Sequence, residues 1–319
     1  MNRFAKYAWG VLAYNIAVVV WGAYVRASKA GAGCGEHWPD CNGQVIPLAG
    51  SAKTLIEFTH RATSGLAGIA VLVLLVWAFR AFPKKHSVRT ASAISFVFII
   101  IEGLIGAVLV KKGLVADNDS IARAVVISIH LVNTLLLLAV LAITAWWAAN
   151  QKTIGIPLFW RQNFKTTVIL SLCIFAVLAL SATGAVTALG ATLFPVNSIA
   201  EGIARDLSPT HILQSLIWIH PVAAVVIGLL ITFVVVLLGY AQKSRLVLKL
   251  TKLQIGFIVT QIMLGGINLL LHAPVWMQLV HLFMADLVWV NLILFAVTLL
   301  SEEQVEEMVS DKQTVMAAI

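Results

Sequence analysis

Long apolar runs occupy most of this 319-residue chain and limit what it can fold into. Hydrophobic residues make up 60% of the sequence and charged residues only 11%, a composition that excludes a soluble globular protein. A helix needs about 20 apolar residues to cross a bilayer. We predict such helices at residues 5–26, 53–80, 89–112, 121–149, 163–190, 209–240, 246–271 and 274–300.

These runs are continuous, whereas the strands of an outer-membrane barrel would read as short alternating segments. Helices satisfy their own backbone hydrogen bonds in lipid, so they are the expected spanning element. The predicted fold class is an all-α membrane protein with about eight transmembrane helices, in contact with the lipid bilayer.

Lysine and arginine predict the orientation, because short basic loops stay on the cytoplasmic side. Thirteen of them fall at one end of the predicted helices before the C-terminal tail, and seven fall at the other end. We therefore expect a multi-pass protein of the cell (inner) membrane with both termini cytoplasmic and the loop after the first helix extracytoplasmic. This loop bias explains the net charge of +8, so the charge does not indicate nucleic-acid binding.

Two halves of the chain resemble each other. The second predicted helix has Leu-Ile-Glu-Phe-Thr-His at 55–60, and the sixth has Leu-Ile-Trp-Ile-His at 216–220. Glu102-Gly103 in the third helix matches Gln261-Ile262 in the seventh, and both the fourth and eighth helices contain His-Leu. We predict two four-helix bundles related as parallel repeats. The domains are 1–150 and 151–300, followed by a cytoplasmic tail at 301–319.

Four histidines recur at matching places in these halves: His60, His130, His220 and His281. Ionisable groups inside a membrane are costly and point to function. His60 and His130 should both lie roughly 10 Å below the outer boundary, and His281 at a comparable depth, given the rise per helical residue. His220 should lie deeper unless its helix begins later than Pro209. Each pair can ligate one heme iron between two helices, so two bis-histidine heme sites are predicted.

The first half carries reactive groups that the second half lacks. Glu57 lies three residues before His60 and on the same helix face, which places a carboxylate beside the first predicted heme. The simpler alternative is an ion pair between Glu57 and Arg61. Cys34 and Cys41 lie in the extracytoplasmic loop, where a disulfide is permitted. That disulfide is either a structural link within the loop or a redox-active pair that exchanges with a partner.

The chain resembles the heme A synthase family over nearly all of residues 5 to 300. The resemblance rests on the loop from Gly31 to Cys41, on Glu57-Phe58-Thr59-His60-Arg61, and on the three later histidines. It implies an oxidoreductase that converts the C8 methyl of heme O to a formyl group by successive hydroxylations, making the cofactor of terminal oxidases. In that reading the first half binds the substrate heme O and the second half holds heme b.

The resemblance also implies residue roles and partners. His60 and His130 would ligate the substrate heme, and His220 and His281 would ligate heme b. Glu57 would act near the oxidised methyl. Heme O synthase and a thiol-disulfide protein are the expected protein partners. Two alternatives stay open at this point: a di-heme b-type cytochrome that transfers electrons, and a heme transporter or chaperone.

Overall fold

The structure, a computed structural model, describes residues 1–47, 50–150 and 164–317, with side chains described as far as Ser301. Within these ranges the chain is helical and forms no strand beyond an isolated bridge between Cys41 and Gln44. Two of the thirteen basic residues that predicted the cytoplasmic side, Lys152 and Arg161, lie outside the described residues.

Eight helical spans in the described part of the chain are long and apolar enough to cross a membrane, which confirms the predicted fold class. They are formed by α1 (Arg3–Ala27), α2 (Ala52–Ala81), α3 (Ser87–Lys111), α4 (Ile121–Asn150), α6 (Phe164–Leu193), α8 with α9 (Ile212–Leu216, Ile219–Tyr240), α10 (Arg245–Leu270) and α11 (Val275–Ala317). α11 continues as a helix beyond residue 300, where its end was predicted.

Polar side chains define where several of these helices begin. The Ser51 hydroxyl accepts a hydrogen bond from the Thr54 amide at 3.2 Å at the start of α2, and Asn2 caps α1 by accepting from the Ala5 amide at 2.7 Å. Such caps satisfy amides that have no partner inside the helix, each contributing about 1 kcal/mol.

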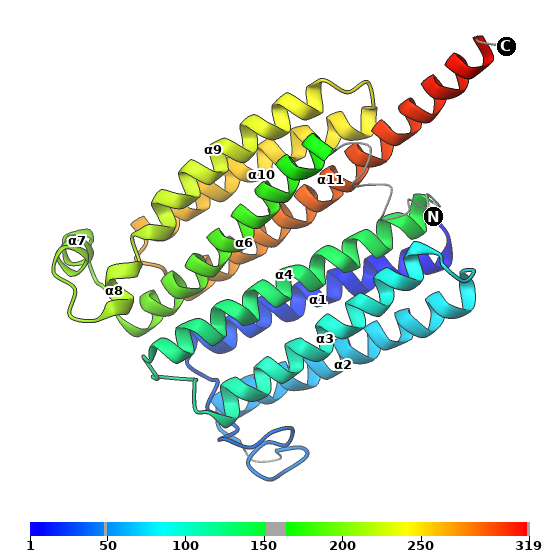
Figure 1. The fold of residues 1–319 in the computed structure, drawn as a ribbon. Coiled ribbons are helices and arrows are strands. Elements are labelled where there is room, and N and C mark those ends of the chain that lie inside the picture. The colour runs from blue at the N-terminus through cyan, green and yellow to red at the C-terminus, as the bar shows by residue number, and fades with distance from the viewer. Residues whose placement is uncertain (48–49, 151–163, 318–319) are drawn as a thin grey trace.

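The helices form two sets of four (Figure 1). In the first set, α1 contacts α2, α2 contacts α3, α3 contacts α4, and α4 returns to α1. The second set closes in the same way through α6, α9, α10 and α11, and the sets meet where α4 contacts α6 and α11. That the second set is a rotated copy of the first stays a prediction.

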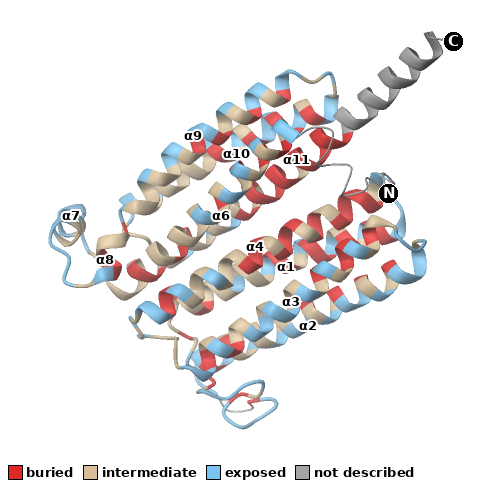
Figure 2. Cartoon of the chain, viewed as in Figure 1, coloured by how far each residue is buried: buried red, intermediate tan, exposed pale blue. Residues whose placement is uncertain are grey.

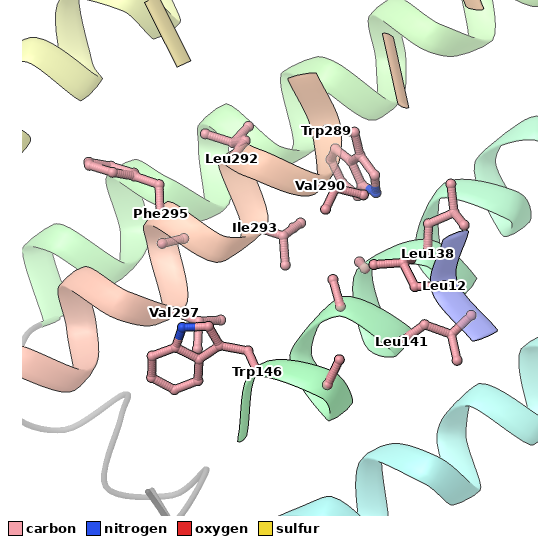
Figure 3. Close-up of a cluster of buried hydrophobic side chains, with 14 of the residues drawn as sticks. Leu12, Leu138, Leu141, Trp146, Trp289, Val290, Leu292, Ile293, Phe295 and Val297 are labelled. Carbon is pink, nitrogen blue, oxygen red and sulfur yellow. The ribbon is translucent and has the colours of Figure 1, made fainter. Parts of the chain in front are cut away.

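The core lies where the sets meet. Buried residues concentrate on α1, α4 and α11, while the outer faces of α2, α3, α9 and α10 expose large apolar side chains, as expected of surfaces that contact lipid (Figure 2). Leu12 of α1, Leu138 and Trp146 of α4, and Trp289 and Phe295 of α11 belong to one cluster (Figure 3). The Trp289 indole also donates a 2.7 Å hydrogen bond to the Leu135 carbonyl, so the sets are joined by both packing and a buried bond.

The sixth span bends just before His220, where α8 ends and α9 begins. Pro221 explains the bend, because proline has no N–H to donate to the carbonyl of Ile217 four residues earlier. That carbonyl instead accepts a 3.3 Å hydrogen bond from the Thr187 hydroxyl of α6. The freed backbone group is thereby satisfied inside the protein, as the bilayer requires.

Candidate functional site

The four candidate histidines lie near the same end of the molecule, the end that carries the cysteine loop and α7 (Ile199–Leu207) (Figure 1). Counted along the helices, His60 is eight residues after Ala52, His130 nine after Ile121 and His281 six after Val275. The sixth span begins at Ile212, so His220 is eight residues inside it and not deeper than the others. At about 1.5 Å per residue, all four lie at comparable depths.

The histidines also come together in the predicted combinations. The His60 and His130 side chains, on α2 and α4, lie close enough for a direct electrostatic interaction. His220 on α9 and His281 on α11 do the same in the second set. Each set of four helices thus brings together one pair of imidazoles. The assignment of these pairs as iron ligands stays a prediction.

A glycine on the neighbouring helix makes room for three of the four rings. A Cβ on Gly22 of α1 would lie 2.8 Å from Cε1 of His60, and a Cβ on Gly184 of α6 would lie 2.9 Å from Cε1 of His220. Gly265 of α10 approaches His281 less closely, at 3.2 Å. Since Gly22 and Gly184 occupy the first helix of their respective sets, the two sets support their second-helix histidines in the same way.

The ring nitrogens fit a heme. Nδ1 of His220 lies 3.2 Å from both the Leu180 carbonyl and the Thr183 hydroxyl, which leaves Nε2 as the ligating atom. Nδ1 is buried without a hydrogen-bond partner among the described residues in His60, His130 and His281, although the Glu102 carboxylate approaches that of His130. A buried nitrogen without a partner is unfavourable in a protein alone, and coordination of an iron would satisfy it. Two histidines per iron suffice for this kind of site.

Glu102 of α3 belongs to this site, although the sequence analysis placed it only in the repeat. Its Oε1 lies 3.3 Å from Nδ1 of His130 and accepts a hydrogen bond from the Thr134 hydroxyl, and its Oε2 accepts from the Asn133 amide at 2.6 Å. The corresponding Gln261 of α10 lies 3.2 Å from Nε2 of His281 through its amide nitrogen. The sequence did contain a signal for Glu102, because Glu102 and Gln261 occupy matched positions in the two halves.

Glu57 of α2 is buried, and both oxygens of its carboxylate have a bonding partner. Its Oε1 pairs with Nη2 of Arg61 at 2.5 Å, and its Oε2 accepts a 2.8 Å hydrogen bond from the Cys34 amide. Arg61 continues into the loop, donating to the carbonyls of His37 and Asp40. The ion pair that was the simpler alternative is therefore present, and through it Glu57 fixes the cysteine loop on α2. A catalytic role for Glu57 stays a prediction.

Cys34 and Cys41 form the disulfide that was predicted as an option. Both residues are buried, at 0% and 1% exposure. Exchange with a partner thiol requires access to a sulfur, so in this conformation the bridge is shielded from exchange, and the choice between a structural and a redox-active pair stays a prediction.

Arg26, in the last turn of α1, joins the two helix sets. Its guanidinium donates to the Ala188 carbonyl at 2.7 Å, to the Thr192 hydroxyl at 2.8 Å and to Oε1 of Gln278 at 2.9 Å. In the sequence Arg26 is one of the seven basic residues at the predicted extracytoplasmic end of the helices. Nearby, Lys29 and Asp117 form an exposed 2.6 Å ion pair, and the hydrogen bond and charge of Lys29 hold the pKa of Asp117 below its ordinary value.

No group of three or more His, Cys, Asp or Glu side chains is arranged as a metal site in the part of the chain that the structure describes. Iron binding by the paired histidines stays a prediction.

Comparison with known proteins decides the family. A family model described as COX15-CtaA, cytochrome oxidase assembly protein, matches residues 5–293. This chain belongs to the COX15-CtaA family. The match covers all eight predicted spans except the end of the last, so the COX15-CtaA assignment applies to both helix sets, with their four histidines and the cysteine loop.

Individual relatives of this COX15-CtaA protein carry two different names. It is 48% identical over 300 residues to a protoheme IX farnesyltransferase of Thermus thermophilus, a match that covers 94% of this chain and 49% of that protein. The chain thus spans about half the length of that relative. It is also 46% identical over 96 residues to the heme A synthase of Geobacillus kaustophilus, covering 30% of each chain. The heme A synthase of Lysinibacillus sphaericus is 37% identical over 115 residues, covering 35% of this chain and 37% of that protein.

Proposed function

We propose that this chain is a heme A synthase, an oxidoreductase that converts the C8 methyl of heme O to a formyl group by successive hydroxylations. The observation that carries the proposal is the duplicated histidine pair, with Glu57 three residues before His60 in the first half only. Membership of the COX15-CtaA family and the partial matches to heme A synthases support it. The match covers 49% of the Thermus farnesyltransferase and 30% and 37% of the two heme A synthases, so coverage does not choose between the names, and the proposal follows the histidine and cysteine pattern instead.

In this proposal the first helix set holds the substrate. His60 and His130 ligate the iron of heme O, and Gly22 leaves the room that the His60 ring occupies. The isoprenoid tail of heme O stays in an apolar environment, where each buried carbon contributes roughly 0.8 kcal/mol. Entry from the side of the bilayer suits such a ligand, since the outer faces of α2 and α3 carry exposed apolar side chains such as Leu66 and Leu104.

The second set holds heme b through His220 and His281. Heme b supplies electron transfer when it is bound. The protein contributes the orientation of the ligands, and the bonds from Nδ1 of His220 to Leu180 and Thr183 illustrate how a ring is fixed.

Glu57 acts beside the oxidised methyl, with Arg61 as its supporting residue. Bonds to Arg61 and to the Cys34 amide hold the two carboxylate oxygens in one orientation. Positioning of this kind contributes to catalysis because it is complete before the substrate binds. We assign the cysteine loop to the extracytoplasmic side and both termini to the cytoplasmic side, with heme O synthase as the source of the substrate and a thiol-disulfide protein as a candidate partner of the loop.

The test is extraction and chromatography of the hemes from protein made together with a heme O synthase. Wild-type protein should yield heme A or its hydroxylated precursor, whereas a di-heme cytochrome or a heme transporter would yield only unaltered hemes. Glu57→Ala should abolish heme A while heme b binding persists. Glu201→Ala, a change of an exposed carboxylate in α7, is the matched control and should leave the product unchanged. Unaltered heme A formation in Glu57→Ala would refute the role of Glu57.

A further inference from the structure

The two fourth-helix histidines have chemically different partners. His130 of α4 faces a carboxylate, with Nδ1 3.3 Å from Oε1 of Glu102, whereas His281 of α11 faces an amide, with Nε2 3.2 Å from Nε2 of Gln261. Both partners come from the third helix of their set and occupy matched positions in the duplicated sequence. The matched residues therefore both approach the histidine of the fourth helix, but a carboxylate oxygen lies at Nδ1 of His130, whereas an amide N–H donates to Nε2 of His281 and leaves Nδ1 of that ring without a partner among the described residues.

Glu102 is held in place by the helix that carries the histidine. Asn133 and Thr134, three and four residues after His130, both donate hydrogen bonds to the Glu102 carboxylate. The same positions after His281 are Met284 and Ala285, which have no group to donate to Gln261. Oε1 of Gln261 accordingly has no partner among the described side chains.

A hydrogen-bond partner changes the electron density that a histidine offers to a metal. A carboxylate beside an imidazole makes the ring a more basic ligand, which stabilises the more oxidised iron, whereas an amide N–H that donates to a ring nitrogen has the opposite tendency. Burial strengthens this difference because the field of a carboxylate is less screened in an apolar environment.

We propose that Glu102 and Gln261 are positioning residues that give the two heme irons different electronic character, the first iron being held more strongly in the ferric state. The inference rests on the proposed heme ligation by His130 and His281. It adds a physical distinction between a substrate-bearing half and an electron-transferring half, each of which contains two histidine ligands.

The test exchanges the two partners and measures the irons. In purified protein carrying both hemes, Glu102→Gln should raise the midpoint potential of the first-set heme, and Gln261→Glu should lower that of the second-set heme. Each substitution should change the ratio of ferric to ferrous iron at a fixed potential by about tenfold, the scale of effects from residues behind metal ligands. Electron paramagnetic resonance of the ferric form should shift for the same heme and not for the other.

A milder pair of substitutions keeps the proposal testable where Glu102→Gln reduces heme loading. Thr134→Val and Asn133→Leu leave the carboxylate in the chain and remove the groups that orient it, so they should shift the first heme in the same direction by a smaller amount. Unchanged potentials in loaded Glu102→Gln and Gln261→Glu proteins would overturn the inference alone. A wild-type protein without heme absorption would instead overturn the proposed function.

Discussion

The guanidinium of Arg26 donates a 2.9 Å hydrogen bond to the side-chain oxygen of Gln278, and so connects the first helix of the chain to the last membrane span. Two further acceptors, the Ala188 carbonyl and the Thr192 hydroxyl, come from α6. One side chain of the first helix set is thus bonded to two helices of the second set, on the side of the molecule where the candidate histidines lie.

Arg26→Leu should destabilise the contact between the helix sets. It removes three hydrogen bonds from a charged donor, a loss of about 2–5 kcal/mol. Thermal unfolding in detergent is the measurement, with Lys29→Leu as the control. Among the described residues the Lys29 ammonium pairs with the exposed Asp117, so that variant should melt close to the wild type. Equal melting of both variants would contradict the joining role of Arg26.

Gly22→Ala should displace His60 and weaken the first heme site. The added Cβ would lie 2.8 Å from Cε1 of the ring, closer than a carbon contact permits. We expect about a tenfold loss of heme affinity in the first set, by analogy with other changes behind metal ligands, with heme b retained. Quantification of bound hemes by absorption checks this result. Gly10→Ala lies on the same helix with no heavy atom within 4 Å of the added Cβ, so it should bind both hemes normally.

Arg61→Leu should expose the disulfide to reductant. Arg61 binds Glu57 and the carbonyls of His37 and Asp40, and these bonds hold a loop in which Cys34 and Cys41 are buried. Loss of charge-assisted bonds of about 1.5–3 kcal/mol each should raise the rate of reduction by dithiothreitol at least about tenfold, since exchange needs access to a sulfur. Alkylation followed by mass measurement reports the rate. Val45→Ala trims an exposed side chain of the same loop and is the control. Wild-type rates in Arg61→Leu would show that other contacts keep the loop closed.

The first turn of α3 should loosen in mild acid. Nδ1 of His86 accepts a 3.2 Å hydrogen bond from the Val88 amide, which requires the unprotonated ring. Burial lowers the pKa of His86 from its ordinary 6.5. Because the folded-state pKa lies below the unfolded one, this stabilisation is complete above about pH 6.5 and is lost as the pH falls through the folded value.

Hydrogen exchange at the start of α3, corrected for intrinsic rates, checks that expectation at pH 7.5 and at pH 5. His86→Asn supplies a cap that does not titrate in this range, so its protection should be independent of pH. Equal pH dependence in the wild type and in His86→Asn would argue against the histidine as the cause.

The sequence predicted the spans well because apolar length is a direct requirement of the bilayer. The observed α2, Ala52–Ala81, differs by one residue at each end from the predicted 53–80. The bend before His220 was missed although Pro221 is visible in the sequence, because an apolar run hides a local break. Helix α7 was also missed, although Ile199, Ile203 and Leu207 recur at helical spacing behind a Ser198 cap.

The site was only partly predictable for a different reason. Histidine pairing followed from depth and repetition, which are properties of position along a helix. The contacts of Arg26 with Ala188, Thr192 and Gln278 join residues more than 160 positions apart, and no local pattern records them. Glu102 shows an intermediate case, since the repeat identified its position while its contact with His130 depends on how α3 packs against α4.

The uneven filling of the molecule constrains how it can move. Large side chains such as Leu141 and Trp146 of α4 and Phe295 of α11 fill the space between the helix sets (Figure 3). They lie toward the end of the molecule opposite the histidine pairs. Close-packed interiors resist deformation. Under the proposed function, we expect a flat macrocycle to enter by separation of the opposite helix ends, with the packed end serving as the pivot.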